Sequence, residues 1–153
     1  MTIQTVGVIG AGTMGNGIAQ TCAVAGLQVV MVDISDAAVQ KGLAMVAGSL
    51  DRLIKKEKIT EADKAAALGR IKTSTSYDDL KAAQLVIEAA TENYELKLKI
   101  LKQVDAIVAP EVIIASNTSS ISITKLAAAT SRADKFIGMH FFNPVPMMAL
   151  VEI

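Results

Sequence analysis

The chain has 153 residues, a length that suits one domain with a substantial core. That core is aliphatic, because 52% of the residues are hydrophobic and only 3% are aromatic. Fifteen basic and fifteen acidic residues cancel, so no general electrostatic field attracts nucleic acid or anionic membranes.

The first 32 residues contain no Asp, Glu, Lys or Arg, as a membrane segment would. Six glycines interrupt this stretch, however, and no Lys or Arg precedes its apolar part as in a signal peptide. The single cysteine, Cys22, lies among Ala and Val, so we expect a buried, reduced thiol. We therefore expect a cytoplasmic protein with neither a membrane nor a nucleic-acid partner.

Residues 5–33 organise the rest of the chain. They contain an apolar run, a glycine-rich turn, a small-residue helix predicted from Thr13 to Ala25, and a second apolar run. Gly10, Gly12 and Gly15 form the pattern G-x-G-x-x-G, and Gly17 adds one more glycine. In this context the three glycines permit a tight turn, leave room for a pyrophosphate, and let helix and strand approach closely. The free N–H groups of the first helical turn, at Thr13 and Met14, would face that anion.

Asp33 closes the second predicted strand, 18 residues past Gly15. A Rossmann unit places there the carboxylate that accepts hydrogen bonds from the adenosine ribose and repels the extra phosphate of NADP. The pattern therefore predicts a dinucleotide site with NAD as the cofactor. The alternative is that Asp33 only caps a helix beginning near Asp36 and that the glycines serve packing.

The remaining chain alternates between helical and strand patterns. Helices are predicted over residues 36–58, from a capping box at Thr60–Asp63 to Gly69, along the apolar stripe Leu96, Ile100, Val104 and Ile107, and over 122–129. Strands are predicted at 71–75 and 84–89, joined by a turn at 77–79, and at 112–115, 136–140 and 147–153. This alternation predicts an α/β, Rossmann-type fold: a mostly parallel sheet flanked by helices, with the last strands antiparallel where the chain reverses around Pro144–Pro146.

Ligands of open parallel sheets bind beyond the carboxyl ends of the strands, and His140, the only histidine, lies at such an end. An imidazole there is a candidate base for an alcohol proton during hydride transfer. Glu152 lies in an apolar strand that returns after the prolines and is expected beside His140, where it would hold the ring. The alternatives are a structural histidine and an exposed Glu152.

Two further polar groups lie at the predicted ligand edge. Residues 116–120 read SNTSS after a buried strand, and the simplest interpretation is a loop in which Ser120 or Ser122 caps the next helix. Glu92 and Lys97 open a helix, and the alternative to a ligand site is a solvated charge pair.

The segments GAGTMGNGIAQ, IEAATE, SNTSS and HFFNPVPMMALVEI together resemble the NAD-binding domain of the L-3-hydroxyacyl-CoA dehydrogenases, in particular the bacterial 3-hydroxybutyryl-CoA dehydrogenases. The resemblance covers the whole chain and implies oxidation of an (S)-3-hydroxyacyl-CoA, or reduction of acetoacetyl-CoA, with NAD. It also implies roles for individual residues: a catalytic dyad of His140 and Glu152, substrate or reactive-group contacts from Ser119 and Asn143, a position near the nicotinamide for Asn117, positions bordering the cofactor ribose for Glu92 and Lys97, and coenzyme A contacts from Ser49 and Lys56.

The chain departs from this family in one respect. Members of the family continue into a helical second domain that makes the dimer interface and closes the substrate cleft, whereas this sequence ends at Ile153. We therefore expect residues 1–153 to be the NAD-binding domain alone, with self-association through its C-terminal strands. The competing hypotheses are a non-catalytic NAD- or acyl-CoA-binding or structural module, and a β-hydroxyacid dehydrogenase with a lysine acid–base, against which the HFFNP segment argues.

Overall fold

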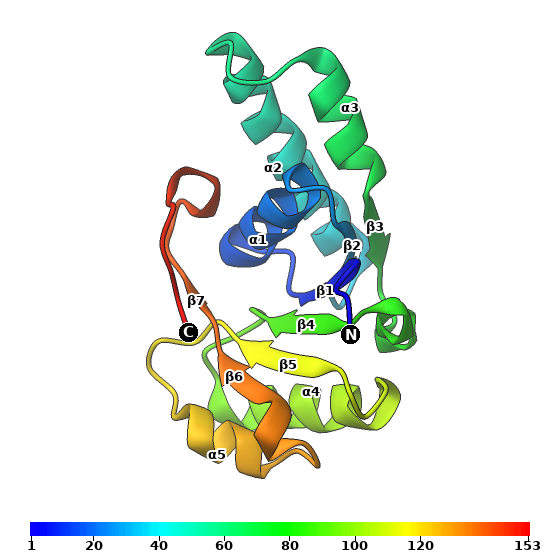
Figure 1. Cartoon of the computed structure of the whole chain (residues 1–153), viewed down its shortest axis with the longest axis vertical. Coiled ribbons are helices and arrows are strands. Elements are labelled where there is room, and N and C mark those ends of the chain that lie inside the picture. The colour runs from blue at the N-terminus through cyan, green and yellow to red at the C-terminus, as the bar shows by residue number, and fades with distance from the viewer.

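A computed structural model describes all residues 1–153 and shows a six-stranded parallel sheet flanked by helices (Figure 1). The strand order is β3-β2-β1-β4-β5-β6, and a separate two-stranded antiparallel sheet pairs β7 with β8. The strands are β1 (Thr5–Ile9), β2 (Gln28–Val32), β3 (Ile71–Ser74), β4 (Leu85–Glu88), β5 (Ile113–Ser116), β6 (Phe136–Gly138), β7 (His140–Phe141) and β8 (Val151–Glu152). The helices are α1 (Thr13–Val24), α2 (Asp36–Lys55), α3 (Glu61–Gly69), α4 (Tyr94–Ile107) and α5 (Ile123–Ala128), with short 3-10 helices η1 (Tyr77–Ala82), η2 (Ala133–Lys135) and η3 (Val145–Met147). The predicted Rossmann-type fold is confirmed.

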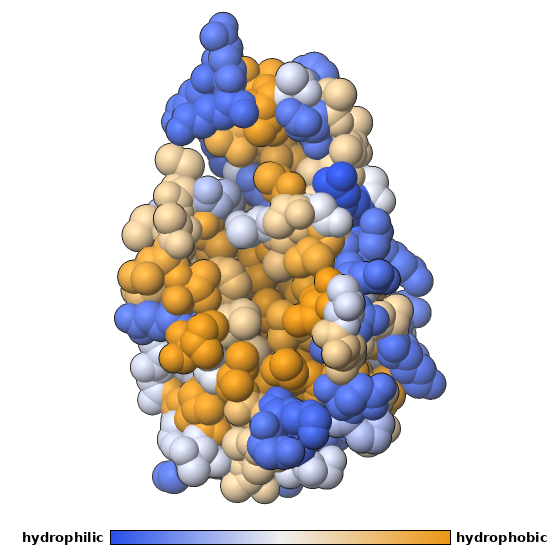
Figure 2. Space-filling model, in the orientation of Figure 1, coloured by the Kyte–Doolittle hydropathy of each residue, from blue (hydrophilic) through white to orange (hydrophobic).

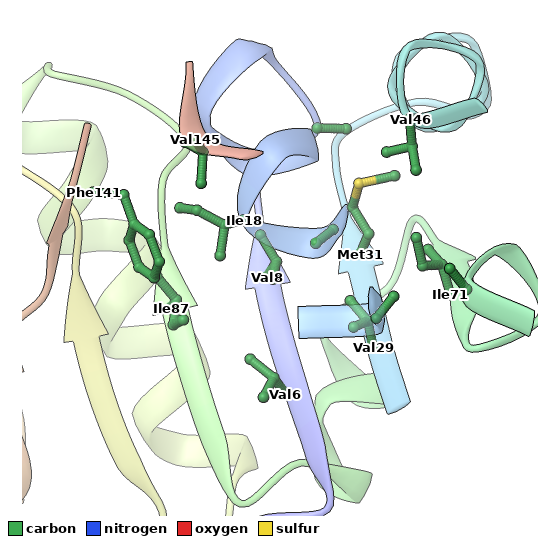
Figure 3. Packing of buried hydrophobic residues seen from close by; sticks show 14 of the residues in the cluster. Val6, Val8, Ile18, Val29, Met31, Val46, Ile71, Ile87, Phe141 and Val145 are labelled. Atoms are coloured by element: carbon green, nitrogen blue, oxygen red, sulfur yellow. The ribbon is translucent and has the colours of Figure 1, made fainter. Parts of the chain in front are cut away.

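The sheet separates two apolar clusters, which explains why its central strands β1, β2 and β4 are mostly apolar. Val29 and Met31 of β2 face a cluster built with α1, α2 and α3, and the intervening Val30 and Val32 face a second cluster built with α4, α5 and η1. Figure 3 shows the first cluster, with Val8 of β1 next to Ile18 at α1 and Val6 farther along the strand. Both faces of the central strands are therefore buried. The carboxyl edge of the sheet is the place where a ligand could reach it.

The helix signals at the chain surface give the observed boundaries. Ser35 caps α2 by accepting a hydrogen bond from the Ala38 N–H, and Thr60 and Asp63 form the predicted capping box of α3. Helix α2 ends at Lys55, three residues earlier than predicted, because the chain turns through a left-handed residue, Glu57 (φ 58°). The predicted turn at residues 77–79 is the start of η1.

The predicted apolar stripe of α4 is wrong at one end. Leu96 is 47% exposed, whereas its neighbour Lys97 is buried with Ile100, Leu101 and Val104. The buried face is therefore rotated by one residue at the start of the helix, and a lysine occupies a position that apolar periodicity does not predict.

The C-terminal segment also differs from the prediction. The strand expected over residues 136–140 divides at Met139 into β6 and β7, and only Val151 and Glu152 of the expected 147–153 strand are paired. The predicted antiparallel arrangement is confirmed, but the two strands leave the main sheet and form their own.

Two findings bear on the environment of the chain. No helix combines the length and the apolar run that crossing a membrane requires. Cys22, expected to be buried, is only half-buried. Burial still raises the pKa of its thiol to about 11, so the thiol is protonated near neutral pH.

Candidate functional site

The glycine loop between β1 and α1 has the shape of a phosphate cradle. Gly10 has a φ of +104°, and a Cβ atom on Gly15 would lie 1.8 Å from the Gly10 carbonyl oxygen, so neither position accepts a side chain. A Cβ on Gly12 would meet nothing within 4 Å, and no side chain caps α1 at this residue. The first N–H groups of α1 therefore face open space across bare backbone, as a pyrophosphate site requires.

Asp33 stands beside this loop at the end of β2. Its carboxylate accepts one hydrogen bond from the Ala11 N–H at 2.8 Å and another from the Ile34 N–H at 2.7 Å. Each carboxylate oxygen has capacity for a further bond, so both remain able to accept from ribose hydroxyls. Asp33 does not cap α2, because Ser35 does; the capping alternative is wrong.

A cavity of about 290 Å³ adjoins the glycine loop and gathers the polar residues that follow β4 and β5. The lining comes from the start of α1, the loop after β4 and the loop after β5: Gly12, Thr13, Met14, Ala89, Ala90, Thr91, Glu92, Lys97, Asn117 and Thr118. Most of the predicted cofactor residues thus share one cavity, and their contacts with a cofactor stay a prediction.

Lys97 is not a partner of Glu92, so the solvated-pair alternative is wrong. Its ammonium pairs with the Glu88 carboxylate, and both side chains are buried, with exposed fractions of 1% and 0%. Glu88 also accepts from the Ser116 hydroxyl at 2.7 Å and the Ala90 N–H at 2.9 Å. A buried carboxylate with an ammonium and two neutral donors has its charge and hydrogen bonds compensated, so the pair tolerates burial beside the cavity that Lys97 lines.

Glu92 instead holds the loop after β5. Its carboxylate accepts from the Thr118 hydroxyl at 2.8 Å and from the Ser120 hydroxyl at 2.9 Å. Ser122, not Ser120, caps α5, through a hydrogen bond from the Lys125 N–H. Of the two capping serines considered, only Ser122 has that role.

Sequence reasoning assigned no role to Glu88, which ends the run Leu-Val-Ile-Glu in a central strand. The signal was present, because a carboxylate in an apolar strand is costly unless it is paired.

His140 and Glu152 are direct cross-strand partners in the β7–β8 sheet. The His140 Nδ1 atom lies 3.5 Å from a Glu152 carboxylate oxygen, and the ring also lies against Phe142, with centroids 4.6 Å apart. His140 is 27% exposed and Glu152 is 64% exposed. The register that sequence alone left open therefore brings the two side chains together, and their catalytic role stays a prediction.

A second cavity, of about 350 Å³, lies between α1, α2 and η3. Ser49 and Lys56, the predicted coenzyme A contacts, line it from α2, and Asn143 lines it from the other side. Its full lining is Thr13, Asn16, Gly17, Gln20, Met45, Ser49, Arg52, Leu53, Lys56 and residues 143–147. Ser119 lies in neither cavity; it is exposed in the loop after β5.

Comparison with known proteins agrees with this geometry. Residues 5–153 match the family described as "3-hydroxyacyl-CoA dehydrogenase, NAD binding domain". The chain is 52% identical to a 3-hydroxybutyryl-CoA dehydrogenase from Bradyrhizobium diazoefficiens, over 99% of the chain and 52% of that protein. It is 44% identical to the fatty acid oxidation complex subunit alpha of Acinetobacter baylyi, over 99% of the chain and 21% of that protein.

Solved structures give the same result. The crystal structure of (S)-3-hydroxybutyryl-CoA dehydrogenase from Ralstonia eutropha superposes with a TM-score of 0.97 at 82% identity, covering 98% of this chain and 53% of that one. The chain thus spans about half the length of the 3-hydroxybutyryl-CoA dehydrogenases that it matches. It belongs to the NAD-binding domain family of the 3-hydroxyacyl-CoA dehydrogenases, and its cofactor is NAD.

Proposed function

We propose that this chain is the cofactor-binding and dyad-bearing part of an NAD-dependent (S)-3-hydroxyacyl-CoA dehydrogenase that acts on the four-carbon substrate. The observation that carries the proposal is the pairing of His140 with Glu152 in a chain where Asp33 is hydrogen-bonded to the glycine loop. The names of the relatives support the substrate class, because those at 52% and 47% identity are 3-hydroxybutyryl-CoA dehydrogenases.

The geometry of the dyad supports a separate role for each nitrogen of the imidazole. Nδ1 faces Glu152, so Nε2 is the atom left to meet a substrate hydroxyl. In oxidation, His140 Nε2 accepts the hydroxyl proton while the hydride leaves C3, and in reduction it returns that proton to the C3 oxygen. The Glu152 carboxylate orients the ring and stabilises its protonated form. When bound, NAD supplies the nicotinamide carbon that accepts or donates the hydride.

The remaining predicted residues divide between the two cavities. Glu92, Lys97 and Asn117 border the cavity beside the glycine loop, which supports their assignment to the cofactor. Ser49 and Lys56 border the other cavity with Asn143, which supports a path for the coenzyme A moiety from α2 toward the dyad. Ser119 and Asn143 are exposed and free to meet the substrate oxygen.

A second candidate function, a module that binds NAD but does not turn over substrate, is favoured by the exposure of the C-terminal segment. Its apolar side chains, Met147, Met148, Leu150, Val151 and Ile153, are between 36% and 80% exposed. In Figure 2, apolar surface occupies the hollow of this face and continues along the margin where the C-terminal segment runs in Figure 1. Residues 1–153 alone should therefore bind NAD and self-associate through this surface. They should give little or no turnover, because a substrate cleft with only one of its two sides does not exclude water from the dyad.

The test compares residues 1–153 alone with a chimera that joins them to the remaining half of the Ralstonia eutropha enzyme. NADH binding, acetoacetyl-CoA reduction at 340 nm and size in solution are measured on both. We expect NADH binding by both proteins, turnover only by the chimera, and association of the isolated domain. A chimera that binds NADH but does not reduce acetoacetyl-CoA would favour the second candidate function, a non-catalytic NAD-binding module. Full turnover by monomeric residues 1–153 would show that the other side of the substrate cleft is not required.

A further inference from the structure

Gly17, the fourth glycine of the loop-and-helix segment, is not part of G-x-G-x-x-G, yet a side chain has no room there. A Cβ atom on this buried residue would lie 2.8 Å from the Val145 Cβ and 3.2 Å from its Cγ2. Carbon atoms in contact are normally about 3.5–4.0 Å apart. Helix α1 and η3 therefore touch through the bare backbone of Gly17.

Val145 anchors the segment that follows His140 and Phe141. It is 3% exposed and belongs to the core cluster, and Figure 3 shows it directed at α1 above Ile18. It is also the one buried residue between positions 143 and 153. The connection from β7 to β8 is therefore held to the body of the domain at a single apolar side chain.

The two members of the dyad are held in different ways. β7 is held by the end of β5 and the loop after it. The Met139 N–H, just before β7, donates to the Ser116 carbonyl in β5 at 2.9 Å, and the Phe141 N–H of β7 donates to the Asn117 side chain in the loop at 2.8 Å. β8 pairs only with β7, over two residues, and both of its side chains are exposed. The place of Glu152 thus depends on the η3 connection, while the place of His140 does not.

We propose that Gly17 is a positioning residue for the dyad: its missing side chain seats Val145 on α1, and this contact returns β8 to the register in which Glu152 faces His140. The catalytic consequence rests on the proposed function, whereas the effect on the register does not. Helix α1 then serves two purposes: its first turn follows the glycine loop, and its second turn contacts η3, which connects β7 to β8.

The direct test is Gly17→Ala in residues 1–153, followed by NMR. Cross-strand NOEs between residues 140–141 and 151–152 report the register, and NADH titration reports the cofactor site. The matched control is Gly48→Ala, since a Cβ there would meet only the Arg52 guanidinium, at 3.8 Å, and both substitutions replace a helical glycine. We expect Gly17→Ala to lose the NOEs while NADH affinity changes less than about twofold, and Gly48→Ala to keep both.

A size swap separates this role from general loss of stability. Val145→Gly alone removes the anchor and should also weaken the NOEs, but combined with Gly17→Ala it leaves room for the new methyl group on the helix. The double variant should therefore be closer to the wild type than Val145→Gly alone. In the chimera, Gly17→Ala should lower kcat roughly 10- to 100-fold, as small displacements of catalytic groups do, and the double variant should recover part of it.

Three results would overturn the proposal. Gly17→Ala could retain the cross-strand NOEs, Gly17→Ala could lose NADH binding together with the NOEs, or the double variant could show NOEs no stronger than those of Val145→Gly alone. If the wild-type chimera shows no turnover, the proposed function fails, and the NOEs still decide whether Gly17 sets the register.

Discussion

The side-chain oxygen of Asn117 accepts a hydrogen bond from the Phe141 N–H at 2.8 Å, which ties the loop after β5 to the strand that carries His140. Asn117 also lines the cavity beside the glycine loop, and its own N–H donates to the Glu88 carbonyl at 2.9 Å. The residue next to His140 is therefore fixed by a side chain of the predicted cofactor site. One hydrogen bond thus links a residue that lines the predicted cofactor cavity to the strand that carries His140.

Cofactor choice should follow Asp33. Residues 34–40 contain no arginine that would bind a 2′-phosphate, and the Asp33 carboxylate would repel one. NAD(H) should bind at least about tenfold more tightly than NADP(H), equivalent to ~1.4 kcal/mol. Fluorescence titration of residues 1–153 with NADH and NADPH measures this, and Asp33→Asn should narrow the difference. Equal affinities in the wild-type chain would mean that Asp33 serves only to hold the Ala11 N–H.

Glu152→Gln tests the dyad in the chimera. The substitution keeps the shape of the side chain but removes the negative charge beside Nδ1, so kcat should fall by roughly two orders of magnitude. NADH affinity should be unchanged, because Glu152 lines neither the glycine loop nor the adjoining cavity. Glu111→Gln, at an exposed position in a turn, is the matched control. Near-normal kcat in Glu152→Gln would make the carboxylate structural.

For the buried Glu88–Lys97 ion pair, removing one charge should cost more stability than removing both. Glu88→Gln leaves an uncompensated ammonium in the interior and should destabilise the domain by about 3–5 kcal/mol. Glu88→Gln combined with Lys97→Met removes both charges and should recover much of that loss. Urea unfolding measures the stabilities, and NADH titration of the double variant asks whether Lys97 contributes to binding. A double variant no more stable than Glu88→Gln would contradict the pairing.

Asp105 should control stability in acid. It pairs with the buried Arg132 at 2.7 Å; burial alone would raise the pKa of its carboxyl, but hydrogen bonds from the Ser131 N–H and from Arg132 outweigh burial and lower it. A carboxyl with a lowered folded pKa stabilises the fold above its unfolded pKa, about 3.9, and this stabilisation is lost as the pH falls through the folded value.

Asp105→Asn should therefore cost about 3 kcal/mol at pH 7, and the difference from the wild type should shrink below pH 4. Urea unfolding at pH 7 and pH 3 measures both. Asp134→Asn is the control: its carboxylate is 78% exposed beside Lys135, so its loss should cost less than about 1 kcal/mol. A pH-independent difference would mean that the Asp105 carboxylate has no linked titration.

The sequence predicted the elements whose signals are local. The glycine-rich turn, the capping box at Thr60 and the start of α2 at Asp36 depend on residues a few positions apart, so each was predicted correctly. Lys97 was not, because it is buried through a partner nine residues earlier, and apolar periodicity does not count a lysine.

The C-terminal segment shows the other limit. The run Met-Met-Ala-Leu-Val-Glu-Ile has the composition of a buried strand, yet all seven residues are exposed and only two of them pair. Its position is set by the contact of Val145 with α1, which joins residues more than a hundred positions apart in the chain. No pattern within the segment indicates that contact, so the register that places Glu152 beside His140 could not be predicted from the sequence.

The strand order has a consequence for the synthesis of the chain. β1 lies between β2 and β4, and Val6 pairs with Val29 on one side and with Leu85 on the other. During synthesis β1 thus keeps one edge unpaired until β4, which pairs Leu85 with Val6, has been made. Unpaired edges of this kind invite association between nascent chains, and long-range parallel pairing is slow to form. The segment that organises the cofactor site is therefore open to such association until β4 is in place.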